Sequence, residues 1–403
     1  MYTRTANLQL MKEINQSIVL NVIRNYGPIS RAEIAKRTKL SSTTISTLVD
    51  DLIEQEYLKE IGEGKSSGGR RPILLKFNPS SHFVIGVELE GRNISVAVTD
   101  LKINIINKLV EEVKNTDESS VVDEIINLVQ QVIERYRVKF EKIVGMGVGA
   151  TGLVDTKRGI IRQAVNLNWK DVPLKDLIED RFDEIPIYID NIANVAALGE
   201  KWSGVGEKAK NLIYIRIGTG IGAGIILNGT VYEGSNGNAG EIGHMTVEPN
   251  GPRCRCGNRG CLEVLASGSA IAKRAVVEIF GGGDSLIKEL ANGSIEKITA
   301  KVVAEAAREG DRLALEIWEE AGEYLGIAIA NLINTYNPEI VIIGGGVAHA
   351  GKLLFEPIKR TVRKRALPGP GKIAKIVPSQ LGDDVSIIGA AALVLEKTFK
   401  VHI

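Results

Sequence analysis

The first apolar pattern in the chain is helical. Residues 17–27 carry apolar side chains at helical spacing, and this segment ends at Gly27-Pro28. The residues that share the apolar stripe are Ile18, Val22 and Ile23. Ser30 then predicts the cap of a second, short helix, because Glu33 follows three residues later and completes a capping box.

A third helix is predicted after a tight turn at Leu40-Ser41. Its buried stripe consists of Ile45, Leu48, Val49, Leu52 and Ile53. Two apolar strands follow at 57–61 and 72–77, and the segment 62–69 between them is rich in glycine and serine. Three helices followed by a β-hairpin predict a winged helix-turn-helix domain over residues 1–80.

The polar residues of this domain are suited to DNA. Hydroxyl side chains occupy the start of the third helix, where the helix end carries positive partial charge and favours phosphate. Basic residues occupy the tip of the hairpin. The candidate DNA-binding residues are Ser42, Thr43, Thr44 and Ser46 in the helix, with Lys65, Arg70 and Arg71 in the wing. A small helical bundle with polar caps is the alternative, but the complete order of elements favours DNA binding.

The remainder of the chain alternates strands with helices. Residues 82–100 predict two strands joined by a turn, and 211–229 repeat this plan with five glycines. Other buried strands are predicted within 143–155, 185–202 and 338–348, and helices at 312–335 and 385–398. The repetition indicates a duplicated α/β architecture with a cleft between two lobes.

Composition agrees with a soluble globular protein. The chain has 403 residues, of which 44% are hydrophobic and 25% charged, so two to three domains are expected. The net charge is only +1, and the excess of basic residues in the first 80 positions is too small to identify a nucleic-acid binder by itself. Because no apolar leader or membrane-length run is present, we expect a cytoplasmic protein.

All three cysteines fall within eight residues, at Cys254, Cys256 and Cys261, and His244 lies ten residues before the first of them. Three thiols and an imidazole are the ligands of a tetrahedral structural zinc, which the clustering favours over three unrelated buried cysteines. Glu241 and Glu263 bracket this loop, which would hold them near each other. They are candidates for acid–base chemistry or for binding, or are simply solvated loop carboxylates.

Four segments together resemble the ROK family (repressors, open reading frames, sugar kinases), which has an actin-like, ribonuclease H-like fold. These segments are GNAGEIGH, CRCGNRGCLE, GTGIGAG and PEIVIIGGG. The resemblance runs from about residue 82 to the C-terminus, and 165–178 and 189–200 are most similar to the xylose-repressor branch. It implies a first lobe formed by 81–193 plus 383–403 and a second lobe, 194–382, that contains the zinc loop.

The resemblance also implies roles for individual residues. The family's zinc ligands correspond to His244, Cys254, Cys256 and Cys261. Its sugar-contacting residues correspond to Asn191, Glu241, His244 and Glu263. Their amide, imidazole and carboxylates are groups that fix sugar hydroxyls. Trp169 is a further candidate for sugar selection, although it could equally be a core residue.

Two positions depart from the family's kinases. Ile192 occupies the position of the catalytic aspartate and cannot accept a proton from an attacking hydroxyl. Residues 88–92 replace the Asp-x-Gly-Gly-Thr phosphate loop, and Glu90 within them would repel ATP phosphates. We therefore expect no catalytic residue and no ATP as a cofactor.

The resemblance implies a transcriptional repressor that binds double-stranded operator DNA and responds to a monosaccharide, D-xylose or glucose. Structural zinc is its only expected cofactor. A homodimer or a dimer of dimers is expected, with no membrane partner. Two alternatives stay open: a bifunctional ROK sugar kinase that also binds DNA, and a repressor that senses a partner protein.

Overall fold

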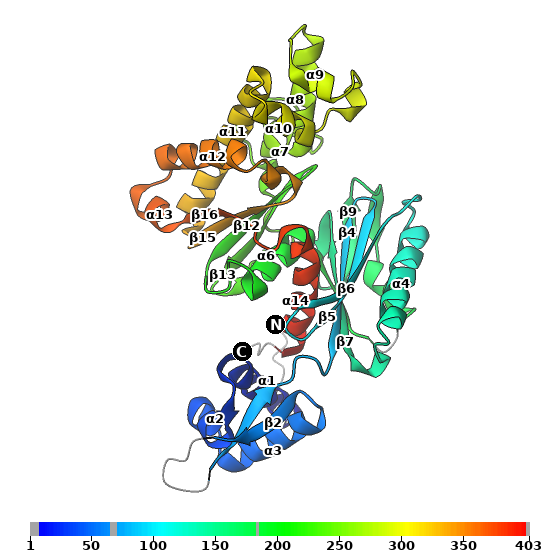
Figure 1. The fold of residues 1–403 in the computed structure, drawn as a ribbon, viewed down its shortest axis with the longest axis vertical. Helices are drawn as coiled ribbons and strands as arrows, with labels where there is room; N and C mark the ends of the chain where they lie inside the picture. The colour runs from blue at the N-terminus through cyan, green and yellow to red at the C-terminus, as the bar shows by residue number, and fades with distance from the viewer. Residues whose placement is uncertain (1–7, 65–70, 183–184, 400–403) are drawn as a thin grey trace.

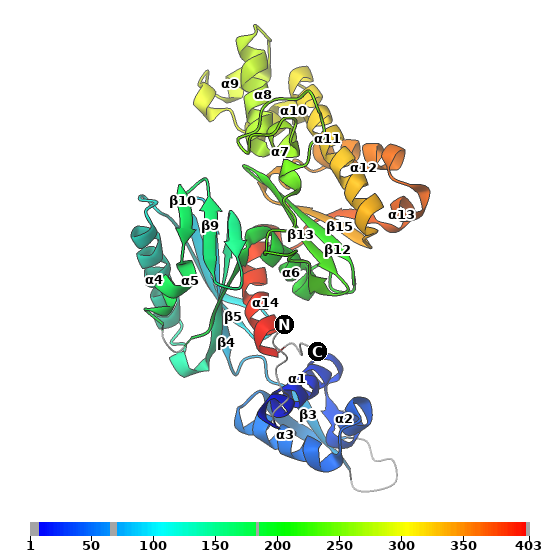
Figure 2. The same ribbon diagram turned by 180° about the vertical axis from the view of Figure 1, so that it is seen from behind.

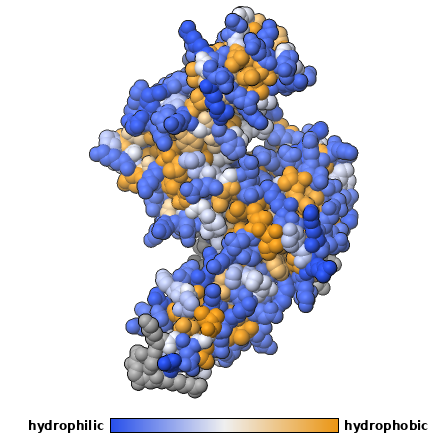
Figure 3. Space-filling model, viewed as in Figure 1, coloured by the Kyte–Doolittle hydropathy of each residue, from blue (hydrophilic) through white to orange (hydrophobic). Residues whose placement is uncertain are grey.

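A computed structural model of the chain describes residues 8–64, 71–182 and 185–399. Within this part the chain forms an N-terminal helical domain followed by a body with two large sheets, and Figure 1 shows the two sheets in separate halves of the body. Among the described residues no helix is both long and apolar enough to cross a bilayer. Polar side chains cover most of the face seen in Figure 3, and apolar ones gather in smaller areas.

The N-terminal domain has the predicted winged-helix order. Its helices are α1 (Leu8–Tyr26), α2 (Arg31–Thr38) and α3 (Ser42–Glu54). Its small sheet has the order β1 (Ile29–Ser30), β3 (Ile73–Phe77), β2 (Leu58–Glu63). Helix α1 begins earlier than predicted and buries Val19, Leu20 and Ile23, whereas Ile18 and Val22 are only partly buried. The predicted stripe was wrong in part because α1 packs on both α14 and the other two helices of its own domain.

Both large sheets of the body have the same plan, which confirms the predicted duplication. The first contains β4 (Phe83–Glu90), β5 (Asn93–Asp100), β6 (Ile105–Glu112), β7 (Ile143–Ala150) and β11 (Ile187–Asn191). The second contains β12 (Leu212–Ile217), β13 (Ile221–Leu227), β14 (Thr230–Val231), β15 (Ile340–Gly344) and β16 (Lys375–Pro378). In each, the first strand pairs antiparallel with its hairpin partner and parallel with the next strand on its other side. The orders are β11-β7-β4-β5-β6 and β16-β15-β12-β13-β14.

A third, smaller sheet and the remaining helices cover the body. The small sheet consists of β8 (Leu153–Asp155), β9 (Ile160–Ala164) and β10 (Trp169–Val172). The helices are α4 (Glu118–Arg135), α5 (Leu174–Glu179), α7 (Leu262–Ala266), α8 (Gly268–Phe280), α9 (Leu286–Leu290), α10 (Ala300–Arg308), α11 (Arg312–Tyr336), α12 (Lys352–Arg365) and α13 (Pro368–Ile373). Trp169 is buried and its indole N–H donates to Thr116 O (2.8 Å), so it is a core residue.

Two helices, α6 (Ile192–Ser203) and α14 (Val385–Phe399), lie between the large sheets, as both ribbon views show (Figures 1 and 2). They meet backbone to backbone at Gly389, where a Cβ would lie 1.6 Å from Val195 O. Gly147 of β7 likewise leaves only 1.8 Å between a Cβ and Ala390 O. A side chain at Gly389 would force α14 away from α6, and one at Gly147 would force α14 away from β7, so α14 packs closely on both.

Buried apolar residues form three clusters. One lies under α4 in the first half of the body, and another lies among α7–α12 in the second half. The third is continuous from the winged helix through α6 and α14 to the second large sheet. The winged-helix domain therefore shares a hydrophobic core with the central helix pair.

Candidate functional site

The loop that contains the cysteines is folded tightly onto itself. Leu262 N–H donates to Met245 O (2.9 Å), and Cys254 N–H donates to Asn258 O (2.7 Å). Gly260 has φ +62°, and a Cβ there would lie 1.5 Å from Glu248 O, so only glycine fits. These contacts bring the ends of the loop together, with Cys254 and Cys261 buried and Cys256 exposed.

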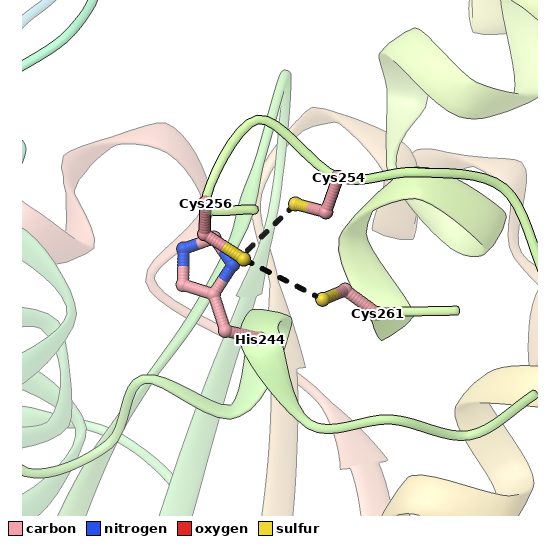
Figure 4. A group of neighbouring side chains, drawn as sticks. All are labelled: His244, Cys254, Cys256 and Cys261. Carbon is pink, nitrogen blue, oxygen red and sulfur yellow. Dashed lines mark hydrogen bonds between the residues drawn. The ribbon is translucent and has the colours of Figure 1, made fainter. Parts of the chain in front are cut away.

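Four potential ligand atoms converge in this loop (Figure 4). The ligand atoms of His244, Cys254, Cys256 and Cys261 all lie within 4.8 Å of one another. Cys254 Sγ is 3.7 Å from His244 Nδ1, and Cys256 Sγ is 3.7 Å from Cys261 Sγ. Tetrahedral zinc with bonds of about 2.0–2.3 Å requires ligand atoms roughly 3.5–3.8 Å apart, so the arrangement could hold such an ion.

The thiols themselves favour a cation at this place. Burial, together with the neighbouring sulfurs, raises the pKa of Cys261 to about 12. In Cys256, a backbone hydrogen bond from Asn258 lowers the pKa. A divalent cation would supply the positive charge that lets all the thiols ionise together.

His244, Glu241 and Glu263 are within electrostatic reach of one another beside the cysteine cluster. Burial raises the pKa of Glu241, with a further contribution from the charge of Glu263, while His244 acts in the opposite direction. The imidazole of His244 faces Cys254 through Nδ1, which leaves Nε2 for a different partner. The charges of Glu263 and His244 thus both act on the carboxylate of Glu241.

Glu263 lies in the first turn of α7 and supports the glycine-rich turn between β12 and β13. Its Oε2 accepts a hydrogen bond from Ile221 N–H (3.2 Å). A Cβ on Gly220 would lie 2.5 Å from that oxygen, so the glycine permits the close approach. No hydrogen bond to its Oε1 is made by the described residues.

Asn191 is the N-cap of α6. Its Oδ1 accepts from Ala193 N–H and its Nδ2 donates to Gly152 O, both at 2.8 Å, so one amide hydrogen is uncommitted by these bonds. The first turn of α6 contacts β13, where a Cβ on Gly224 would lie 2.1 Å from Ala193 O. The segment that precedes Glu241 packs on the same strand, because a Cβ on Gly240 would lie 2.0 Å from Ala223 O. Strand β13 therefore brings together segments that are far apart in sequence.

The sequence reasoning did not identify Asp190 as a functional residue. This buried carboxylate accepts from Asn191 N–H (2.6 Å) and from Asn194 Nδ2 (2.8 Å), which fixes the backbone at the cap of α6. Burial raises the pKa of Asp190 to about 6. An acidic residue at the end of the apolar strand β11 was the signal that could have found it.

Asp190→Asn is expected to stabilise the protein at pH 8. The folded state keeps the Asp190 proton up to about pH 6, whereas the unfolded chain loses it near pH 4, so the wild type loses stability as pH rises between these values. The amide oxygen can still accept both hydrogen bonds. Chemical denaturation should show a gain of roughly 2 kcal/mol at pH 8 that disappears near pH 4. A variant less stable than the wild type at pH 8 would contradict this interpretation.

The end of β4 contributes to an ion-pair cluster. Arg216 of β12 pairs with Glu90 and lies 3.7 Å from Glu88 Oε1, so the cluster joins the two large sheets. Burial raises the pKa of Glu88, and Arg216 opposes this rise. Arg216 was missed from the sequence, although a charge inside the apolar strand LIYIRI was a visible signal. Ile192 is buried as the first residue of α6.

The candidate DNA-binding residues differ in their availability. Ser42 and Thr43 are exposed at the start of α3. Thr44 and Ser46 are partly buried, and the hydroxyl of Thr44 hydrogen-bonds that of Ser41 (2.7 Å). Ser41, which the sequence reasoning assigned to the turn, is the N-cap of α3.

Of the three candidate basic residues of the wing, the structure describes one. Arg71 is exposed and lies 3.9 Å from Glu63. Lys65 and Arg70 lie outside the described residues. Nothing in the described contacts of Arg71 buries it away from a nucleic acid.

Comparison with known proteins matches both parts of the chain. Residues 84–397 match the ROK family, and residues 11–71 match the MarR family. The chain is 35% identical over 396 residues to the xylose repressor of Caldicellulosiruptor bescii, covering 96% of this chain and 97% of that relative.

Two solved structures are similar to different extents of the chain, one to nearly all of it and one to its body. A ROK family transcriptional regulator, a homologue of the Escherichia coli Mlc protein, has a TM-score of 0.85 at 30% identity and covers 97% of this chain and 100% of its own. A ROK family glucokinase from Streptomyces griseus, solved with glucose and AMPPNP, has a TM-score of 0.69 at 33% identity and covers 77% of this chain and 98% of its own. The chain belongs to the ROK family, with an actin-like sugar-kinase-like body preceded by a MarR-type winged helix.

Proposed function

We propose that this protein is a transcriptional repressor whose affinity for operator DNA changes when a monosaccharide binds in its body. The observation that carries the proposal is the presence, in one chain, of an exposed α3 N-terminus and of Glu241, His244 and Glu263 in one region. The similarity over 96% of the chain to a xylose repressor supports the same function. Residues 1–80 would bind DNA, and a first lobe (81–193 with 383–403) and a second lobe (194–382) would enclose the sugar.

The sugar would be held by hydrogen bonds to its hydroxyls. Glu241 and Glu263 offer acceptors, Asn191 offers an amide hydrogen, and His244 offers Nε2. Burial of Glu241 strengthens such bonds, because the carboxylate has lost part of its hydration. D-xylose is the proposed effector, since the similar C. bescii protein is named a xylose repressor.

Zinc would stabilise the floor of this site. We assign it the four ligands His244, Cys254, Cys256 and Cys261, whose donor atoms have the spacing and chemistry that tetrahedral zinc requires. His244 would bind the metal through Nδ1 and donate to a sugar hydroxyl through Nε2, so the metal would fix the tautomer. The metal would be structural and would take no part in a reaction.

DNA would be contacted by the N-terminal turn of α3 and by the wing. Ser42 and Thr43 have the exposure that contact with bases or phosphates requires, whereas Thr44 and Ser46 would contribute mainly through the position of the helix. Arg71 would contact the phosphate backbone, and Lys65 and Arg70 are proposed for the same role. A homodimer would place two α3 helices on the half-sites of a palindromic operator.

A sugar kinase is the second candidate function, because the body resembles the S. griseus glucokinase. Two observations oppose it. Ile192 offers no base at the position of the catalytic aspartate, and the Glu90–Arg216 pair lies beside Gly218, at the start of the glycine-rich turn. A coupled assay of ATP turnover with glucose, xylose and fructose should show no activity, and robust turnover would restore the kinase function.

The proposed function is tested by measuring DNA affinity with and without sugar. An operator fragment selected from random DNA by the protein itself, labelled with a fluorophore, should bind with a Kd that rises or falls when D-xylose is added at fixed salt. A thermal-shift screen with D-glucose and D-fructose would identify a different effector. If no monosaccharide alters either readout, a partner protein is the signal instead.

A further inference from the structure

We propose that helix α6 transmits sugar binding to the DNA-binding domain, and that the contact between Arg24 and Trp202 is where the signal passes. The inference rests on the proposed function and extends it to a specific pair of positioning residues. Arg24 belongs to α1 of the winged helix, and Trp202 lies in the last turn of α6. Neither residue belongs to the proposed sugar, metal or DNA contacts.

The two ends of α6 are in different environments. Its N-cap is Asn191, one of the proposed sugar contacts, whose amide also bonds Gly152 O of the first half of the body. The helix has 12 residues and is therefore about 18 Å long. Trp202 near its other end lies under the guanidinium of Arg24, with Cζ 4.0 Å from the ring centroid. One short helix thus spans the distance between the sugar site and the DNA-binding domain.

The packing of α6 leaves little room for independent motion. Its first turn contacts β13, where a Cβ on Gly224 would lie 2.1 Å from Ala193 O. Its opposite side contacts β7, where a Cβ on Gly149 would lie 2.5 Å from Val195 Cγ2. Any change in the spacing of the two large sheets must therefore displace α6 relative to at least one of them.

The winged helix is held firmly enough to follow such a displacement. Its apolar residues are continuous with those of α6 and α14 in one cluster. Asn21 Nδ2 donates to Phe399 O at the end of α14 (3.1 Å), and Tyr57 stacks on His82 with ring centroids 4.3 Å apart. A loosely tethered domain would absorb a small shift of α6, whereas a packed one must move or rotate with it.

The Arg24–Trp202 contact can stabilise one position of α6 relative to α1 over another. Burial lowers the pKa of Arg24, and Glu207 opposes this change, so the guanidinium is partly desolvated with a carboxylate in reach. Cation–π attraction increases when the cation loses water. A sugar that binds Asn191 and the two carboxylates would favour one position of α6. The Arg24–Trp202 contact would then shift α1 together with α6.

The experiment compares the wild type with Arg24→Ala and Trp202→Ala. The operator fragment is one selected by the wild type. D-xylose, D-glucose and D-fructose are first tested for a change in the operator Kd of the wild type. The DNA affinity of each variant is then measured with and without the sugar that causes this change. Titration calorimetry measures sugar binding to each protein without DNA. In allosteric systems the operator Kd values with and without ligand typically differ by 5–150-fold. In both variants the ratio of these two Kd values should be smaller than the wild-type ratio by more than about twofold. Sugar affinity without DNA should stay within about twofold of the wild type.

Two further variants separate coupling from general damage. Arg37→Ala removes a similar contact, with Cζ 4.2 Å from the Tyr26 ring, that lies wholly within the winged helix. It should change operator affinity equally with and without sugar and so preserve the ratio. Trp202→Phe keeps an aromatic face and should retain more of the response than Trp202→Ala.

Two outcomes overturn different claims. The first outcome is a ratio of operator Kd values, with and without sugar, that stays within twofold of the wild type in both Arg24→Ala and Trp202→Ala. It would refute transmission through this contact and leave the proposed repressor function intact. A wild type that responds to no monosaccharide would refute the proposed function itself. Because Arg24 is only partly buried, its alanine variant keeps the test decisive even if Trp202→Ala fails to fold.

Discussion

Replacing Glu263 with glutamine is expected to weaken monosaccharide binding by about 10- to 100-fold, because a charged acceptor of sugar hydroxyls becomes a neutral amide. The variant keeps an oxygen that can accept from Ile221 N–H, so the glycine-rich turn should retain its conformation. Titration calorimetry with D-xylose, or with the effector that the thermal-shift screen identifies, measures the change. Operator affinity without sugar should equal that of the wild type.

Glu248→Gln is the matched control for Glu263→Gln. Glu248 lies in the same loop, where its Oε1 accepts from Asn250 N–H at 3.4 Å, and it is not among the proposed sugar contacts. The control should bind sugar as the wild type does. If Glu263→Gln also binds sugar within twofold of the wild type, Glu263 is a structural carboxylate that supports the turn and nothing more.

Cys256→Ser should remove the metal and, with it, most of the sugar response. Cys256 is exposed whereas Cys254 and Cys261 are buried, so serine at this position deletes one ligand without opening a cavity. Elemental analysis should find about one zinc per wild-type chain and almost none in the variant. Sugar affinity should fall by roughly tenfold or more, because His244 loses the partner that orients its ring.

Thr246→Ala is the matched control for this loop. It removes a hydroxyl that accepts from Asn258 Nδ2 (3.0 Å) and leaves all four donor atoms in place, so zinc should be retained. Two results would count against the structural role of zinc. One is a Cys256→Ser protein that still holds stoichiometric metal, and the other is a metal-free variant with an unaltered sugar response.

Much of the fold could be predicted because its signals are local. Helix α3 was predicted from an apolar stripe, and four of its five predicted residues, Ile45, Leu48, Val49 and Leu52, are buried. Ser30 caps α2 as expected, accepting from Glu33 N–H, although the Glu33 side chain pairs with Arg37. The cysteine cluster was equally visible, since three ligands within eight residues cannot lie far apart.

The rest depended on contacts between distant segments. Spacing along the chain shows neither that Arg216 pairs with Glu90 across two sheets nor that Asp190 is buried beneath the cap of α6. The early start of α1 and its shifted stripe reflect its packing on α14, which is more than 350 residues away. Both the first turn of α6 and the segment before Glu241 pack on β13, through Gly224 against Ala193 O and through Gly240 against Ala223 O.

The common role of the central helices also follows from such long-range packing. In the sequence Gly389 is simply a small residue, but in the fold it sets the distance between α6 and α14. The continuous apolar cluster then joins those helices to the winged helix. For that reason the winged helix and the ROK body, which appear separate in the sequence, share one core in the folded protein.

The most direct measurement is a titration of labelled operator DNA with this protein at fixed salt, in the absence and presence of saturating D-xylose, followed by fluorescence anisotropy. We predict that the operator Kd changes by at least about fivefold on sugar addition, as allosteric coupling of ordinary strength requires, and that Glu263→Gln shifts the required sugar concentration upward. An operator Kd that is the same without sugar and with D-xylose, D-glucose and D-fructose would contradict the proposed sugar-responsive repressor.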